Sequence, residues 1–302
     1  MPERSCPICH TSASSARLFM KQNIDPSRLS SFSFASRKLP EFMCHQLVQC
    51  TVCDLVYAND PPDQSLLANA YHISDFDSHQ EADDAAQSYA TAIQPVLQQL
   101  KQMETALEIG TGTGIFLDHL KRAGFKRVVG VEPSSAAIAA APEHRRAWIQ
   151  KGIFREEDHA LESYDLICCF MTLEHVLDPN TIVSAASKLL RPGGAIALVT
   201  HDYRSWVNRL LGSRSPIIDI EHMQLFSPKS IRLLLNKNKI QSIQVHSFHN
   251  RYTLRYWARL LPITQERKHD LINVLVRLGI ADHHFGFNVG NMLSYGYRPP
   301  HG

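Results

Sequence analysis

One ten-residue stretch constrains the fold more than any other part of this sequence. It is Thr105-Ala-Leu-Glu-Ile-Gly-Thr-Gly-Thr-Gly114, in which an apolar run ends at an acid and three glycines follow at alternate positions. Glycine has no Cβ, so the backbone can bend sharply there and a ligand can lie against its amides. The stretch predicts a strand that runs into a cofactor-binding turn, followed by a helix from Ile115 to Ala123.

A second acid supports this interpretation. The apolar run from Arg127 to Val131 ends at Glu132, about 24 residues after Glu108. In nucleotide-binding βαβ units an acid at comparable spacing binds the ribose hydroxyls. The glycines recur at every second residue, which differs from the Gly-x-Gly-x-x-Gly pattern of dinucleotide sites. The pair of signals predicts a cofactor that contains a ribose.

Strand and helix patterns alternate through this half of the chain. Such alternation predicts a parallel sheet with right-handed crossovers, and ligands of such sheets bind beyond the carboxyl ends of the strands. Glu108, Glu132 and Phe170 fall at these ends. The predicted strands are 105–109, 127–132, 147–150, 163–170 and 195–200, and the predicted helices are 114–123, 134–141 and 180–190.

Three motifs in order resemble those of one enzyme family. They are the Glu-x-Gly-x-Gly-x-Gly turn, the segment Ser163 to Phe170 with its loop Met171 to Pro179, and Leu189-Leu-Arg-Pro-Gly-Gly194. As a set they resemble motif I and the fourth and fifth strands of the class I S-adenosylmethionine-dependent methyltransferases. The resemblance implies an α/β fold: a Rossmann-like, seven-stranded methyltransferase sheet with helices on both faces.

The resemblance also implies the cofactor, S-adenosylmethionine, and its contacts. Three glycines would pass under its methionine and ribose portions, and two acids would bind the loop or ammonium and the two ribose hydroxyls. Other residues would contact the adenine or, through a backbone carbonyl, the ammonium. The implied cofactor residues are Glu108, Gly110, Gly112, Gly114, Glu132, Pro133, Ile153, Phe154 and Phe170.

The N-terminal segment carries a second signal. Cys6-Pro-Ile-Cys9 and Cys50-Thr-Val-Cys53 are two Cys-x-x-Cys knuckles, a spacing at which four thiolates complete a structural zinc site. Unrelated reduced thiols are the alternative, and Cys44, His45 and His10 are weaker candidates as ligands. We therefore predict a zinc-ribbon-like module over residues 1–62.

This module resembles the zinc-binding region that precedes some bacterial methyltransferases, including deoxysugar C-methyltransferases. Asp54 stands where those proteins usually have glycine, and Phe76 stands where a second tyrosine is expected. Tyr71 is predicted to pack between modules, with a place in the substrate pocket as the alternative.

Residues 63–103 follow as a helical linker or lid, and 104–302 as the methyltransferase domain. Asp75 to Asp84 is acidic and predicts a hinge or lid, while Pro95 should kink or divide the helix that follows. The domain contains acceptor-side insertions at 201–226 and 249–280. Phe285 to Tyr297 is predicted as one final strand, antiparallel to 240–248.

Two histidines are candidates for the catalytic base. His175 follows the fourth strand, where the family places the methyl group and acceptor, but a structural histidine that caps the loop is equally compatible with the pattern. Glu221-His222, before the helix start Ser227-Pro228, resembles a Glu-His pair in the same zinc-region enzymes, where the histidine is the proposed base. The predicted catalytic residues are His222, Glu221 and His175.

Composition limits the partners. Lys and Arg number 31 against 29 Asp and Glu, a formal net charge of +2, so no overall field favours nucleic acid. No apolar run suits a membrane span or signal peptide, so we expect a cytoplasmic protein without a membrane partner. Arg251, Arg255 and Arg259 form a basic stripe that could hold a phosphate, although a solvated helix face is the favoured interpretation.

We thus expect an enzyme that methylates a small-molecule acceptor, such as a saccharide, a nucleotide-linked sugar or another secondary metabolite. A metal-dependent catechol type is disfavoured, because the loop after the fourth strand has no carboxylate cluster for magnesium. The alternatives are an RNA methyltransferase whose zinc module reads nucleic acid, and a cofactor-binding module without catalysis.

Overall fold

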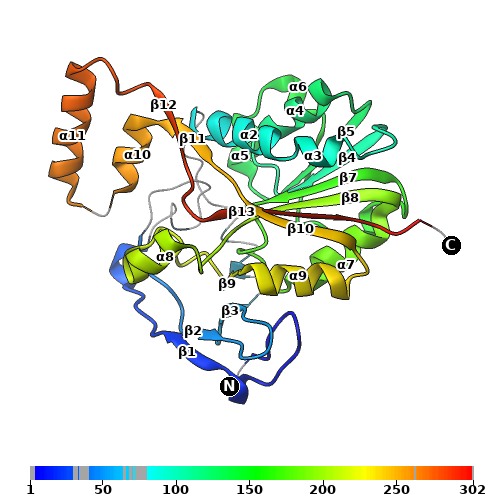
Figure 1. The fold of residues 1–302 in the computed structure, drawn as a ribbon, viewed down its shortest axis with the longest axis horizontal. Coiled ribbons are helices and arrows are strands. Elements are labelled where there is room, and N and C mark those ends of the chain that lie inside the picture. Colours follow the sequence, from blue (N-terminus) through cyan, green and yellow to red (C-terminus); the bar gives the residue numbers. More distant parts are fainter. Residues whose placement is uncertain are drawn as a thin grey trace.

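A mixed seven-stranded sheet forms the centre of the computed structural model (Figure 1), which describes residues 4–29, 33, 41–63, 66–67, 70, 72, 80–261 and 263–300. The strand order is β10-β13-β8-β7-β4-β5-β6. The five strands from β8 to β6 are parallel, and β13 is antiparallel to both of its neighbours. The predicted fold class is therefore confirmed. The bounds are β4 (Thr105–Ile109), β5 (Arg127–Glu132), β6 (Ile149–Lys151), β7 (Tyr164–Phe170), β8 (Leu190–His201), β10 (Gln241–Ser247) and β13 (Asn291–Tyr297).

Helices cover both faces of this sheet. Buried side chains of α2, α3 and α4 pack on one face, and those of α7 and α9 pack on the other. Pro95 lies in the first turn of α3, directly after the end of α2, which confirms that it divides the predicted helix. The bounds are α2 (Gln80–Ala92), α3 (Gln94–Leu97), α4 (Ile115–Ala123), α5 (Ser135–Ala140), α6 (Glu143–Arg146), α7 (Pro179–Leu189) and α9 (Pro228–Lys237).

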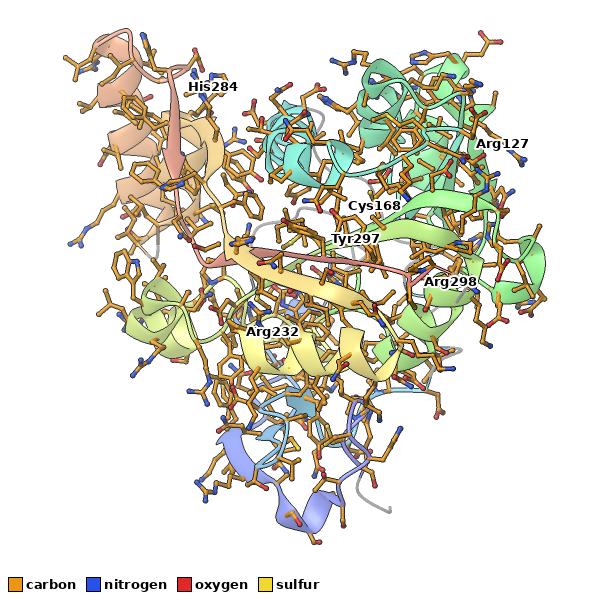
Figure 2. The ribbon with its side chains drawn as sticks, turned by 45° about the vertical axis from the view of Figure 1, so that its right-hand side comes forward. Arg127, Cys168, Arg232, His284, Tyr297 and Arg298 are labelled. Atoms are coloured by element: carbon orange, nitrogen blue, oxygen red, sulfur yellow. The ribbon has the colours of Figure 1, made fainter. Side chains whose placement is uncertain are left out.

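Local sequence explains several of these boundaries. The α9 helix begins as predicted, with Ser227 as N-cap, Pro228 in the first turn, and a reciprocal capping box between Ser227 and Ser230. Strand β7 is buried along its whole length, as expected for a central parallel strand with helices on both faces. Figure 2 shows its Cys168 within the sheet, whereas Arg127 and Arg232 are exposed.

The N-terminal module forms a second sheet, in the order β1-β2-β3-β9. Its last strand comes from the insertion at 201–226, directly after Glu221 and His222. Backbone pairing of β3 with β9 is extended by a hydrogen bond from Ala58 N to Met223 O of 2.8 Å. The bounds are β1 (Arg17–Met20), β2 (Leu47–Gln49), β3 (Val56–Ala58) and β9 (Gln224–Leu225), with short 3₁₀ helices η1 (Ala13–Ser15) and η2 (Pro26–Arg28).

The two insertions lie on the same side of the molecule, at the left of Figure 1. The first contains α8 (Trp206–Leu211) and η4 (Gly212–Arg214); the second contains β11 (Asn250–Thr253), α10 (Leu254–Leu260), α11 (Gln265–Arg277) and β12 (His284–Phe287). The remaining short element is η3 (Glu156–Asp158).

Three predictions need correction or lie outside the description. The single final strand over Phe285 to Tyr297 was wrong: β12 pairs with β11, and β13 begins only after Gly290, whose φ of +87° turns the chain. Its β13 part is antiparallel to β10, as predicted. Residues 80–84 are the start of α2 rather than a hinge. Tyr71, Phe76 and residues 75–79 lie outside the described residues.

Among the helices described, none is both long and apolar enough to cross a bilayer.

Candidate functional site

A cavity of about 1190 Å³ opens beyond the carboxyl ends of β4, β5, β7 and β8. Glu108, Glu132 and Phe170 line it, as the positions of these residues at strand ends predicted. The glycine turn after β4 lines one part of the cavity. Side chains of α8, α10 and α11 line another part.

Glycine is needed at two positions of the turn for two different physical reasons. Gly110 and Gly112 both have positive φ, +76° and +56°. A Cβ at Gly110 would lie 2.3 Å from Oγ1 of Thr172, whereas a Cβ at Gly112 would meet no atom within 4 Å. Gly110 is therefore required by packing, and Gly112 leaves the backbone open to the cavity.

The two predicted cofactor acids hold this turn in place. The buried Glu132 carboxylate accepts hydrogen bonds from Gly112 N (2.7 Å) and Ser134 N (2.8 Å), one on each oxygen. Burial raises the pKa of Glu132, and the two amides oppose that shift. Glu108 accepts a hydrogen bond from the Thr111 hydroxyl. Each carboxylate oxygen has two lone pairs, so Glu132 retains acceptor capacity toward a ligand.

The structure brings the other predicted cofactor residues to the cavity with one exception. Pro133, Ile153 and Phe154 line it beside Phe170. Gly114 is not among the lining residues; it has a φ of +69° and precedes α4, where a Cβ would lie 3.1 Å from Cδ1 of Ile149. Its glycine is explained by backbone conformation and tight packing rather than by contact with the cavity.

All three predicted catalytic residues lie in one cluster on the cavity wall. Nδ1 of His175 lies 3.4 Å from Oε2 of Glu221, and the rings of His175 and His222 have centroids 5.0 Å apart. His175 follows β7, while Glu221 and His222 precede β9. Two loops far apart in sequence thus meet, and the Met223 amide, next to His222, joins them by donating to the Glu174 carbonyl at 2.7 Å.

The polar environment separates the roles of these imidazoles. Nδ1 of His222 donates to the Ile217 carbonyl at 2.8 Å, and burial lowers the pKa of His222 to about 3. Burial alone would also lower the pKa of His175, but the adjacent Glu221 charge outweighs it and raises that pKa. His222 is therefore neutral near pH 7, and His175 is the more basic imidazole.

Sequence reasoning missed two members of this cluster. His201, at the end of β8, has its ring 5.5 Å from that of His222, and its Nδ1 donates to Oδ1 of Asn291 at 2.7 Å. The buried Glu174 accepts a hydrogen bond from the His201 amide (2.7 Å), and burial raises its pKa to about 7. The available signal for His201 was its position immediately after a predicted strand end.

The rest of the cavity is mainly apolar. It is lined by side chains of the two insertions, including Trp206, Leu210, Trp257, Leu261, Leu271 and Leu275. None of the described residues that line it is a lysine or arginine. In the predicted basic stripe, Arg255 pairs with Asp282 and Arg259 pairs with Glu81.

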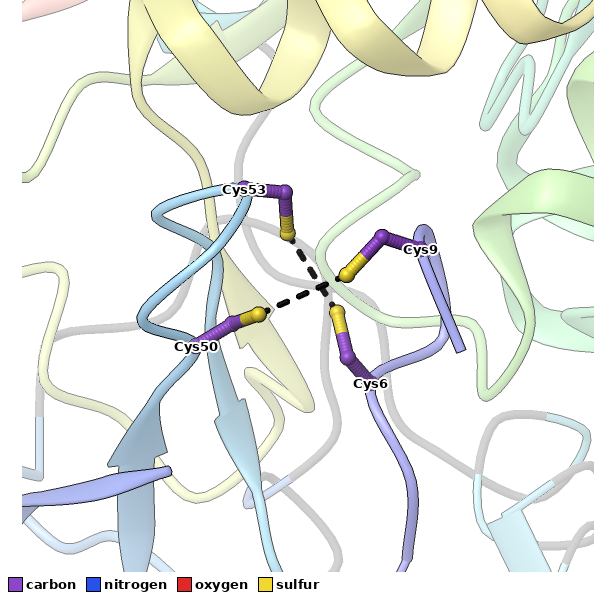
Figure 3. A group of neighbouring side chains, drawn as sticks. All are labelled: Cys6, Cys9, Cys50 and Cys53. Carbon is purple, nitrogen blue, oxygen red and sulfur yellow. Dashed lines mark hydrogen bonds between the residues drawn. The ribbon is translucent and has the colours of Figure 1, made fainter. Parts of the chain in front are cut away.

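The four predicted zinc ligands converge in the N-terminal module (Figure 3). Their sulfur atoms all lie within 4.8 Å of one another, with 3.3 Å between Cys6 and Cys53 and 3.4 Å between Cys9 and Cys50. Four sulfurs at about 2.3 Å from a tetrahedral zinc ion would be about 3.8 Å apart, so the donor set fits this ion after a small expansion. The buried Cys44 is not part of this group.

The fold and the cavity define a Rossmann-like α/β methyltransferase. A family model described as a methyltransferase domain matches residues 78–244, more than half of the chain. The chain therefore belongs to this methyltransferase domain family, and the predicted class of S-adenosylmethionine-dependent methyltransferases is confirmed.

Individual relatives match shorter segments. The chain is 33% identical over 112 residues to a ubiquinone biosynthesis O-methyltransferase of Hydrogenovibrio crunogenus, covering 34% of this chain and 46% of the relative. It is 25% identical over 159 residues to the same-named protein of Vibrio atlanticus, covering 47% and 65%. The chain thus spans about half the length of the first of these curated relatives and just under two thirds of the second.

Among solved structures, an S-adenosylmethionine-dependent methyltransferase of Thermotoga maritima superposes with a TM-score of 0.47 at 21% identity. That match covers 72% of this chain and 91% of the other.

Proposed function

We propose that the protein transfers the methyl group of S-adenosylmethionine to a hydroxyl oxygen of a small, mainly apolar acceptor. The observation that carries this proposal is that one cavity holds all three parts. The glycine turn and Glu132, the cluster of His175, Glu221 and His222, and apolar side chains of the insertions all line it.

The residues around the glycine turn support S-adenosylmethionine as the cofactor. In this proposal, Gly110 and Gly112 lie under the methionine and ribose, and Glu132 accepts from the ribose hydroxyls. Pro133, Ile153 and Phe154 contact the adenine, as the resemblance implies. Acidic side chains without lysine or arginine in the described lining also suit a cofactor that carries a positive sulfonium.

The relatives and the rest of the cavity lining support a hydroxyl-bearing acceptor without phosphate groups. The relatives are named O-methyltransferases, which favours oxygen as the methylated atom. A nucleotide-linked sugar would bring phosphates, and RNA would bring a phosphate backbone. Neither is favoured by a described lining that has no lysine or arginine.

The chemistry requires alignment and removal of one proton. Methyl transfer is an in-line displacement at a carbon activated by sulfonium charge, so the cavity must hold acceptor and methyl in contact. A hydroxyl is a much better nucleophile once it is deprotonated. We assign this deprotonation to the cluster of His175, Glu221 and His222.

We also propose that Cys6, Cys9, Cys50 and Cys53 hold a structural zinc ion. The convergence of four thiols from two knuckles supports this, because a Cys₄ set leaves no open position for substrate.

The test measures cofactor binding and methyl transfer separately. Calorimetry should detect S-adenosylmethionine binding, and labelled methyl should pass to members of a panel of apolar phenols and alcohols. His222→Ala and His175→Ala should each lower turnover by about 10² to 10⁴ with cofactor affinity nearly unchanged. His246→Ala, at an exposed histidine of β10, serves as the control. Transfer to RNA but to no small acceptor, or unchanged turnover in both variants, would contradict the proposal.

A further inference from the structure

The cluster of His175, Glu221 and His222 has the chemistry and spacing of a metal site. One ligand atom from each residue lies within 4.8 Å of the others, and all three residues line the cavity. Two imidazoles and one carboxylate are a donor set that binds zinc and similar divalent ions in catalytic sites, where a fourth position stays open. We infer that this cluster binds a divalent transition-metal ion, an inference that rests on the proposed function.

The distance between His175 and Glu221 fits two ligands of one metal ion. Nδ1 of His175 and Oε2 of Glu221 are 3.4 Å apart. Two ligands at about 2.1 Å from a tetrahedral metal ion are about 3.4 Å from each other.

The surroundings of His222 fix its ring in the way that metal-binding histidines require. Metal-binding histidines generally donate their second ring N–H to a carbonyl or carboxylate, which sets the tautomer. Nδ1 of His222 makes such a bond to the Ile217 carbonyl at 2.8 Å, so its Nε2 is the nitrogen with a free lone pair. The adjacent His201 is held in the same way by Asn291.

The charge balance points to a cation. The cluster lies beside buried carboxylates of Glu174 and Asp219, while no described lining residue is a lysine or arginine. One oxygen of Glu174, Oε2, is buried and has no hydrogen-bond partner in the described part of the chain. A divalent ion bound at the cluster would be attracted by these neighbouring acidic groups.

The ion would act on the acceptor. The acceptor hydroxyl binds at the open position, the metal lowers the pKa of that hydroxyl, and its proton passes to a water molecule. The resulting oxyanion attacks the methyl carbon, so a C–O bond forms as the C–S bond breaks. The products are the methyl ether and neutral S-adenosylhomocysteine. His175 then binds the metal and is not itself the base.

Cobalt(II) distinguishes this site from the four cysteines, because thiolate ligands give an intense sulfur-to-cobalt charge-transfer band that nitrogen and oxygen ligands lack. The full chain, first loaded with one equivalent of zinc to fill the four-thiolate site, is titrated with Co²⁺ in the absence of cofactor and acceptor. We expect metal analysis to find two metal ions per chain, and the second to show cobalt d–d bands without the sulfur band.

Variants locate the second ion. His222→Ala and Glu221→Gln should each weaken cobalt binding by more than about 100-fold, beyond the loss typical of a second-shell partner. The matched control is His144→Ala, which removes an exposed histidine 3.1 Å from Asp118. It should leave both ions bound. Retained S-adenosylmethionine binding shows that each variant is folded.

A wild-type chain that binds metal only at its thiolates overturns the inference, and so does a second cobalt site that survives in both cluster variants. Either result leaves the proposed methyl transfer standing, because that is judged by cofactor binding and labelled product. Conversely, if the cluster binds cobalt but the protein transfers no methyl group, the metal-site inference stands and the proposed function is wrong.

Discussion

Glu132 has two tasks at the end of β5. Its carboxylate fixes the glycine turn through Gly112 N and Ser134 N, and it is our proposed acceptor for the ribose hydroxyls. The same side chain therefore couples the shape of the turn to cofactor binding.

We predict that Glu132→Ala weakens S-adenosylmethionine binding by about 1.5 to 3 kcal/mol, the scale of hydrogen bonds to a charged group. This corresponds to a Kd about 10-fold to 150-fold higher. Titration calorimetry gives the value directly. An unchanged affinity would remove Glu132 from the ribose role.

The two glycines of the turn should respond differently to the same substitution. Gly110→Ala combines positive φ with a Cβ 2.3 Å from Thr172, so it should lower the free energy of unfolding by about 2 to 5 kcal/mol. Gly112→Ala has only the conformational cost of about 1 to 2 kcal/mol, but its methyl enters the cofactor space. Denaturant unfolding should show the larger loss of unfolding free energy for Gly110→Ala. Calorimetry should show that Gly112→Ala loses more S-adenosylmethionine affinity than its small loss of stability explains. Equal stability losses would contradict this difference.

At the scale of elements, the short strand β9 joins three parts of the molecule. It pairs with β3, it follows Glu221 and His222, and its Gln224 contacts the loop that carries His175. Nε2 of Gln224 donates to the carbonyls of Leu173 and Val176. Both sides of the proposed active cluster therefore depend on one strand.

We expect Gln224→Ala to leave these carbonyls without their donor and to destabilise the protein by about 1 to 3 kcal/mol. Turnover should fall while S-adenosylmethionine affinity stays near that of the wild type, because the glycine turn is untouched. Gln244→Ala, on the exposed face of β10, is the control. A fall in cofactor affinity as large as the fall in turnover would contradict a local effect.

At the scale of the whole molecule, the N-terminal module and the central sheet share one core. Ile8, Leu55 and Tyr57 of the module pack in the same buried cluster as Leu107 and Ile231. Asp54 adds a polar connection, since its carboxylate accepts hydrogen bonds from Arg204 ahead of α8. The module thus supports the acceptor side of the cavity.

We therefore predict that Cys50→Ser releases the proposed structural zinc and lowers the thermal midpoint. Because β9 completes the module's sheet, turnover should fall more than S-adenosylmethionine affinity. Metal analysis, thermal unfolding and calorimetry on the full chain test the three statements. Protein purified without chelators that contains no zinc would defeat the four-thiolate proposal.

The strands and turns of the cofactor half could be predicted from sequence because their signals are local. Apolar runs that end at Glu108 and Glu132, with glycines at positions of positive φ, specify β4, β5 and the turn between β4 and α4. The same is true of the α9 start at Ser227 and Pro228. Positive φ favours glycine, and a helix start favours serine followed by proline, so these residue types indicate the local backbone conformation.

The sequence by itself therefore determined the parallel strands of the sheet and the cofactor turn. It also identified the two Cys-x-x-Cys knuckles as one predicted set of zinc ligands. Only the tertiary structure decided what depends on long-range packing. It placed β9 in the N-terminal sheet, turned Gly114 toward α4, and brought His201 beside His222. It also decided which of the two candidate histidines is the more basic, because burial lowers the pKa of His222 while the neighbouring Glu221 carboxylate raises that of His175, and neither effect can be read from adjacent residues.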